Sequence, residues 1–150
     1  MMPDRICWGS ALVGFSFGLL AASILTMTKV KAAPLPSPID IAEVERIDQR
    51  EADAIAILTK AFLTDAGIPI KGQWRFPAYR TRLNGFHGLS FDATAVVNSE
   101  RPEDCQKVDL AHEYAHLFLG AEYGLTPTES EGYATAVDDM MKRALFVPNC

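Results

Sequence analysis

The five residues from His112 to His116 read H-E-Y-A-H, and they constrain this chain more than any other feature. Residues 107–120 carry apolar side chains at helical spacing, so we predict a helix that ends at Gly120. Positions four apart on a helix lie on the same face, which brings both imidazoles within reach of one metal ion. Glu113 can then lie beside a water molecule on that ion. A helix that carries these residues by chance is the alternative interpretation.

A catalytic zinc site needs a third protein ligand and an open position for water. No histidine follows His116, so the downstream candidates are acidic: Glu122, Glu129, Glu131, Asp138 and Asp139. Residues 126–141 have the pattern of a second helix, in which Thr126 and Glu129 fit a capping box. Because that cap would occupy Glu129, we predict Glu131 as the third ligand, with Glu129 as the alternative.

These two segments resemble the ImmA/IrrE-like metallopeptidases, which are zinc enzymes of the gluzincin type. Residues 110–120 match the metal-binding helix of that family closely, and residues 131–136 match the start of its next helix more loosely. The resemblance covers about residues 92–148. It implies a minimal zincin-like fold and a Zn²⁺ site with Glu113 as the general base and three ligands: His112, His116 and Glu131.

The chemistry of these residues predicts a zinc-dependent metallopeptidase that acts on a peptide or protein substrate. Zn²⁺ lowers the pKa of a bound water toward neutrality. Glu113 would accept the proton as that water attacks a carbonyl carbon, and would pass it to the leaving nitrogen. Two alternatives stay open: a zinc-dependent amidase that acts on cell-wall material, and a non-catalytic zinc-stabilised binding domain. Other divalent ions can also occupy such a site.

Other residues are candidates for supporting roles at the site. Asp138 is either a hydrogen-bond partner of a ligand histidine or a solvated residue on the second helix. The donor that stabilises the oxyanion stays unassigned among three candidates, each with packing or a turn as its simpler role: His87, Tyr123 and Tyr133.

An apolar stretch of about 22 residues, from Ile6 to Met27, is long enough to span a bilayer. We predict a signal peptide or membrane anchor over residues 1–32, which engages the membrane or the secretion machinery. Residues 33–38 form a Pro-rich linker, and residues 39–150 form the zincin-like domain. The sequence therefore predicts an exported or membrane-anchored protein in an extracytoplasmic compartment such as the periplasm.

Charge limits the classes of partner. The chain holds 14 Lys and Arg against 19 Asp and Glu, which gives a net charge of −5. Residues 33–150 alone carry −7, because residues 1–32 hold three of the basic residues and one acidic residue. This balance argues against nucleic acid and against anionic membrane surfaces as electrostatic partners.

The remaining pattern predicts an α+β fold. We expect a long N-terminal helix over residues 41–66, with Asp40 as its cap and Gly67 at its end. Residues 68–98 read as short strands and turns that form a small antiparallel sheet, which precedes the two helices of the metal site. The best strand is residues 93–98, and the resemblance implies that it lies at the sheet edge beside the site.

Cys105 and Cys150 are the two cysteines outside the apolar stretch. In an oxidising compartment they can form a disulfide between the first metal-site helix and the C-terminus. The alternative is a buried Cys105 and a free thiol at Cys150.

Overall fold

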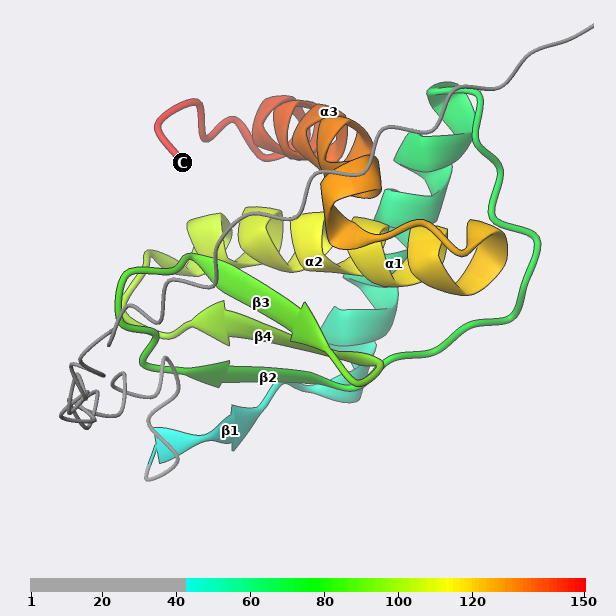
Figure 1. Ribbon diagram of the computed structural model, residues 1–150. Coiled ribbons are helices and arrows are strands. Elements are labelled where there is room, and N and C mark those ends of the chain that lie inside the picture. The colour runs from blue at the N-terminus through cyan, green and yellow to red at the C-terminus, as the bar shows by residue number, and fades with distance from the viewer. Residues whose placement is uncertain (1–42) are drawn as a thin grey trace, which may run out of the picture. The chain divides into compact units, whose positions relative to one another are not determined.

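The computed structural model describes residues 43–150, in which helices cover one face of a four-stranded sheet (Figure 1). The strands lie in the order β1-β2-β4-β3, with these bounds: β1 Glu45–Arg46, β2 Ala78–Thr81, β3 Gly88–Phe91 and β4 Thr94–Asn98. Three helices lie in this part of the chain: α1 Gln49–Asp65, α2 Glu103–Tyr123 and α3 Pro127–Leu145. The fold is α+β, as predicted.

The sheet is mixed, because β2 and β4 run parallel while the other neighbours run antiparallel. The chain reverses direction twice between these two strands, once in residues 82–87 and once in the turn at Asp92 and Ala93. β4 then inserts between β2 and β3. The prediction of an antiparallel sheet is therefore wrong at this pair of strands.

β4 lies inside the sheet, whereas the prediction places residues 93–98 at its edge. Ala95, Val96 and Val97 are all buried, so both faces of the strand are covered. β3 takes the edge position instead, and it pairs only with β4 among the described residues.

α1 is shorter than the predicted N-terminal helix. It begins after Asp48, whose carboxylate accepts two backbone hydrogen bonds from the first turn. The chain before it is extended, because Ile47 donates its N–H to a carbonyl of β2 and so continues the pairing of β1. A helix from residue 41 is therefore wrong for residues 43–48, and the predicted cap Asp40 lies outside the described residues.

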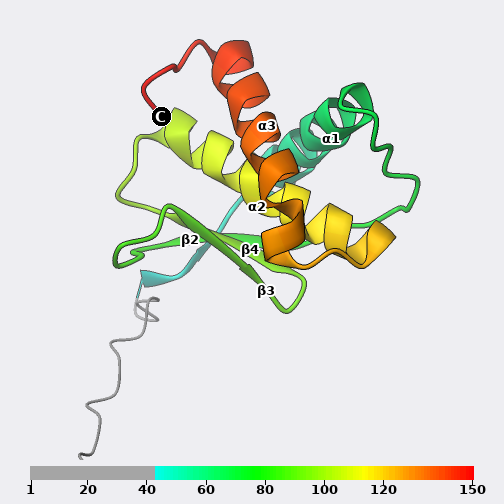
Figure 2. The same cartoon turned by 45° about the horizontal axis from the view of Figure 1, so that its top comes forward.

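α2 lies between the sheet and the other two helices (Figure 2). It runs past its predicted end at Gly120 and stops at Gly124, which has a φ of 71° and donates its N–H to the Gly120 carbonyl. The predicted capping box at the start of α3 is confirmed. Thr126 donates its N–H to the Glu129 carboxylate at 2.8 Å, and its hydroxyl accepts from the Glu129 N–H at 3.3 Å.

The core lies where α2 packs against the sheet, α1 and α3. Its fully buried members include one side chain or more from each of these elements: Leu63, Val97, Tyr114, Phe118 and Val137. Burial on several sides holds α2 in one position, and α2 carries both histidines of the candidate site.

Cys105, near the start of α2, is bonded to Cys150 in a disulfide, so the structure has the first of the two predicted alternatives. Within residues 43–150, no helix has the length and apolar character needed to cross a membrane. The predicted N-terminal segment (residues 1–32) and linker (33–38) lie outside the described residues.

Candidate metal centre

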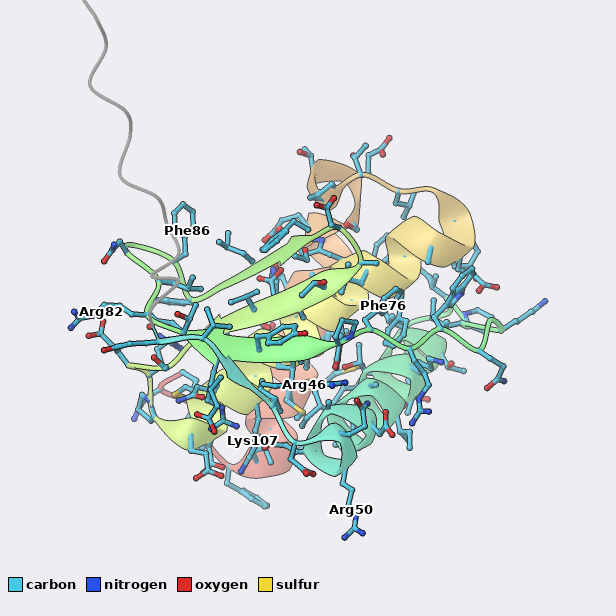
Figure 3. The ribbon with its side chains drawn as sticks, turned by 90° about the horizontal axis from the view of Figure 1, so that it is seen from below. Arg46, Arg50, Phe76, Arg82, Phe86 and Lys107 are labelled. Carbon is cyan, nitrogen blue, oxygen red and sulfur yellow. A yellow bond between two sulfur atoms is a disulfide. The ribbon has the colours of Figure 1, made fainter. Side chains whose placement is uncertain are left out.

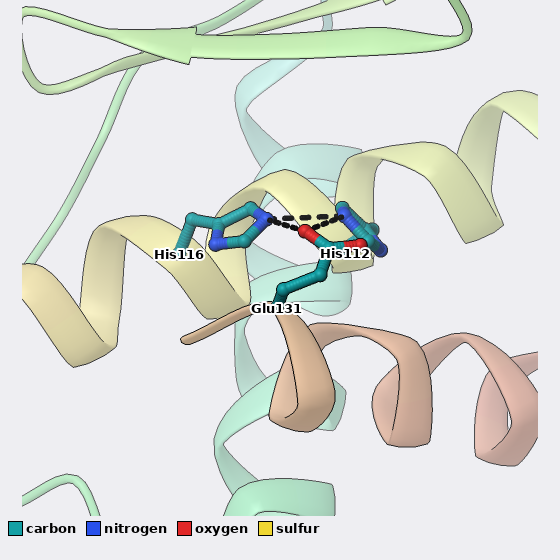
Figure 4. A group of neighbouring side chains, drawn as sticks. All are labelled: His112, His116 and Glu131. Atoms are coloured by element: carbon teal, nitrogen blue, oxygen red, sulfur yellow. Dashed lines mark hydrogen bonds and ion pairs between the residues drawn. The ribbon is translucent and has the colours of Figure 1, made fainter. Parts of the chain in front are cut away.

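Three potential ligand atoms converge between α2 and the N-terminal part of α3 (Figure 4). His112 Nε2 lies 3.1 Å from His116 Nε2, and Glu131 Oε2 lies 3.2 Å from His116 Nε2 and 3.8 Å from His112 Nε2. Ligands about 2.0–2.1 Å from a tetrahedral zinc ion lie about 3.3 Å from one another. The spacing of the three atoms therefore fits such an ion.

A hydrogen bond from α3 favours the tautomer of His116 that carries its proton on Nδ1. Its Nδ1 lies 2.6 Å from the Ser130 hydroxyl, which also donates to the Thr126 carbonyl at 2.9 Å. A hydroxyl has a single proton, so Ser130 uses it on the carbonyl and accepts the Nδ1–H of His116. The lone pair of His116 Nε2 then faces His112 and Glu131, as metal binding requires.

His112 has a carboxylate on the side of its ring opposite the cluster. Its Nδ1 lies 3.3 Å from Asp138 Oδ2, in the geometry of an ion pair rather than of a linear hydrogen bond. Burial opposes charge on His112, but Asp138, followed by Glu113 and Glu131, raises its pKa above the ordinary value. When His112 carries its proton on Nδ1, its Nε2 lone pair is free. The Nε2 lone pairs of His112 and His116 and the carboxylate of Glu131 then lie close together, and a cation between them would stabilise this arrangement.

His116 has the opposite electrostatic environment. Burial and the neighbouring His112 both lower its pKa below the ordinary value. Neutral imidazole is the form that binds a metal. His116 is therefore held in its ligand form by burial, by His112 and by the hydrogen bond to Ser130.

Glu113 is buried between α2 and the edge strand β3, with 7% of its surface exposed. Burial raises its pKa, and the Ser90 hydroxyl opposes this shift with a hydrogen bond. Gly88 lies so close that a Cβ atom there would be 2.8 Å from Glu113 Oε1 and 2.9 Å from its Cγ. The backbone of β3 and the hydroxyl of Ser90 thus define where this carboxylate lies.

Two other acidic candidates are engaged elsewhere. Glu129 caps α3, which lowers its pKa through hydrogen bonds from the backbone and side chain of Thr126. Glu122 accepts hydrogen bonds from the Trp74 indole at 2.8 Å and from the N–H of Gly72 at 2.9 Å. Of the acidic candidates, the structure brings Glu131 to the Nε2 atoms of both histidines, and Asp138 to the opposite ring nitrogen of His112.

The three candidate oxyanion donors lie in different surroundings. Tyr123 donates its hydroxyl to the Pro69 carbonyl at 2.6 Å, and Tyr133 is 39% exposed on α3. His87 shares the lining of a cavity with His112 and Glu113. The role therefore stays unassigned, and His87 is the candidate that adjoins the site.

The sequence did not indicate Ser130, Gly88 or Ser90 as residues of the site. Ser130 is fully buried on the face of α3 that also buries Ala134 and Val137. Its spacing from these apolar residues was the one signal in the sequence that Ser130 is buried. A buried hydroxyl needs a hydrogen-bond partner, so this spacing could have indicated a contact with another element. The contacts of Gly88 and Ser90 with Glu113 depend on how β3 packs against α2, which no local pattern encodes.

No family model, curated protein or solved structure gives a significant match to this chain.

Proposed function

We propose that this chain is a zinc-dependent peptidase whose metal is held by His112, His116 and Glu131. The observation that carries the proposal is the convergence of three ligand atoms at zinc spacing beside a buried carboxylate, Glu113. Two histidines and a glutamate form a known ligand set of catalytic zinc sites, and they leave a coordination position open. Ser130 and Asp138 contact the outer nitrogens of the two histidines, as partners of metal-bound histidines do.

A zinc ion held by His112, His116 and Glu131 would supply a Lewis acid and would lower the pKa of a bound water to about 7. Glu113 is the general base in this proposal. Because burial raises its pKa, its carboxylate accepts a proton more readily than a solvated one does. Glu113 takes the proton of the attacking water and then delivers it to the nitrogen of the broken bond.

The edge strand β3 favours a peptide as the substrate. Asn98 donates its N–H to the His87 carbonyl, which sets the alternation of the β3–β4 ladder. Gly88 and Ser90 therefore direct their backbone N–H and C=O groups away from β4, toward the edge of the sheet that no other described strand pairs with. An extended peptide can pair with such an edge. The same two residues contact Glu113, so a peptide bound there lies beside the proposed base.

Hydrolysis of a mixed peptide pool by the zinc-loaded full chain tests the proposal, with product masses as the readout. We expect cleavage by the wild type and a loss of at least about 100-fold in Glu113→Gln, which keeps the size of the side chain and removes the base. Zinc content is measured in both proteins, because the variant should keep its metal.

Three results contradict the proposal. Equal hydrolysis by the wild type and Glu113→Gln would assign the activity to another group or to a contaminant. Cleavage of a peptidoglycan fragment in place of peptides would favour the amidase. A biological function that survives Glu113→Gln but not His112→Ala would favour the non-catalytic zinc-stabilised domain.

A further inference from the structure

Two cavities adjoin the candidate metal centre, one on the side of each histidine. The acidic cavity, of about 310 Å³, is lined by His112 and chiefly by Phe86, His87, Asp109, Glu113 and Asp138. The apolar cavity, of about 320 Å³, is lined by His116 and chiefly by Phe76, Ala93, Leu117, Ala121 and Leu125. Each cavity has one of the two histidines in its lining, and the Nε2 atoms of these histidines are 3.1 Å apart.

The edge strand β3 connects the two cavities. Gly88, at its start, lines the acidic cavity, and Ser90, further along the strand, lines the apolar one. Figure 3 shows Phe86 and Phe76 near opposite ends of the strands. A peptide paired with β3 directs the side chains of two residues that lie two positions apart toward the two cavities, and the bonds between these residues lie beside Glu113.

The lining of the acidic cavity suits a cation. Among the described residues, this lining contains three carboxylates, Asp109, Glu113 and Asp138, and neither Lys nor Arg. Arg101, outside the lining, pairs with Asp109 at 2.6 Å, and His112 lies beside Asp138, so part of this charge is balanced. Asp138 Oδ1 is nevertheless buried without a hydrogen-bond partner among the described residues. The ring of Phe86, half of which is exposed, adds a face for a cation.

Within residues 43–150, no charged residue lines the apolar cavity. Its wall includes Ala93, which has a φ of 58°, a conformation that favours glycine. Ala93 therefore adds a methyl group to the wall of the cavity at a backbone conformation that is strained for any residue other than glycine. Ala121 on α2 is exposed and lines the same cavity, so its small side chain leaves the space open.

We infer that the site selects peptides with a cationic side chain on one side of the cleaved bond and an apolar side chain on the other. The cationic side chain occupies the acidic cavity, and the apolar one occupies the apolar cavity. This inference rests on the proposed peptidase function and specifies its substrate class.

The test is a set of peptides, each with Lys or Gln on one side of the cleaved bond and Leu or Ala two positions further along the peptide on the other side, in both orders. The zinc-loaded full chain should prefer Lys to Gln and Leu to Ala in one of the two orders. Ala121→Leu fills the apolar cavity, so kcat/KM for Leu peptides should fall by about tenfold while Ala peptides change little. Asp109→Asn should reduce the preference for Lys over Gln by about tenfold.

Asp109 is buried and paired with Arg101, so Asp109→Asn can also disturb the fold. Phe86→Ala changes an exposed residue of the same cavity, and it should also weaken the preference for Lys over Gln. Cleavage without either preference, or preferences that no variant alters, would overturn the inference and leave the peptidase function standing. If no peptide is cleaved, binding of the same peptides to the zinc-loaded wild type is measured by fluorescence anisotropy. Binding with both preferences then supports the cavities although the peptidase function fails, and binding without them overturns both.

Discussion

The Ser130 hydroxyl on α3 accepts the Nδ1–H of His116 on α2 at 2.6 Å. Ser130 has two roles. It packs in the interface between α2 and α3, and its hydrogen bond to Nδ1 of His116 leaves Nε2 of that histidine free for a metal. Its own proton is used by the Thr126 carbonyl at the N-cap of α3. The start of α3 therefore positions Glu131 and orients His116 together.

Replacement of Ser130 by alanine should weaken zinc binding by roughly 10- to 100-fold, the usual cost of losing such a partner of a metal-bound histidine. The His116 ring would keep its place on α2 but lose the contact that holds its tautomer. A competition titration with a coloured chelator measures the affinity. Thr135→Ala, an exposed change on the same helix, is the control and should have no effect. Equal affinity in Ser130→Ala and the wild type would show that the contact does not matter for the metal.

Gly88→Ala should lower kcat with zinc content unchanged. The added methyl group would be 2.8–2.9 Å from Glu113 atoms, so the carboxylate must move away from the position that β3 and Ser90 define. Gly132→Ala is the matched control, because a Cβ at that position in α3 meets no atom within 4 Å. Steady-state kinetics and metal analysis on both variants measure the effect. Full activity in Gly88→Ala would mean that the position of Glu113 is not critical.

Glu122 should contribute stability that depends on pH. The Trp74 indole, followed by the Gly72 N–H, lowers the pKa of this carboxyl in the folded state. Its contribution is therefore fully present above the unfolded-state pKa, and it is lost as the pH falls through the lower, folded-state pKa. The difference in free energy of unfolding between the wild type and Glu122→Gln should shrink from about pH 6 to about pH 3, around the ordinary glutamate pKa of about 4.3.

Urea unfolding followed by tryptophan fluorescence measures this difference, and Glu43→Gln, an exposed position near the start of the described chain, is the control. A difference that stays constant over the whole range would contradict the account of Glu122.

Loss of the disulfide should lower the free energy of unfolding by about 2–4 kcal/mol, because the bond closes a long loop in the unfolded chain. Cys105 and Cys150 are separated by 45 positions. Cys150→Ser and reduction of the wild type with a phosphine should give similar losses in urea unfolding. The variant should no longer respond to the phosphine. If reduction leaves the free energy of unfolding of the wild type unchanged, the disulfide is either absent or does not contribute to stability.

Local patterns in the sequence predicted some features of the site and fold correctly. The capping box depends on Thr126 and Glu129, which lie within one turn, so their spacing alone indicates it. The predicted start of α1 was wrong for residues 43–48, because Asp40 and Asp48 are of the same residue type and either one suits a helix cap. The choice between them depends on Ile47, whose N–H pairs with β2 more than thirty residues later in the chain.

Contacts between elements could not be predicted in the same way. The alternation of side chains indicates a strand but not its neighbours, so the parallel pairing of β2 with β4 was missed. Gly88 contacts Glu113 only because β3 forms the sheet edge against α2. Ser130 reaches His116 across 14 positions of sequence through the packing of two helices.

The most direct test of the central claim is metal content, measured by elemental analysis of the full chain purified without chelators. We predict about one zinc per chain in the wild type, and its loss in both His116→Ala and Glu131→Ala. Glu129→Ala is the matched control: it removes the carboxylate of the capping box, leaves Thr126 as the N-cap of α3, and should keep the zinc. A folded wild type without metal, or a Glu131→Ala variant that keeps its zinc, would contradict the site.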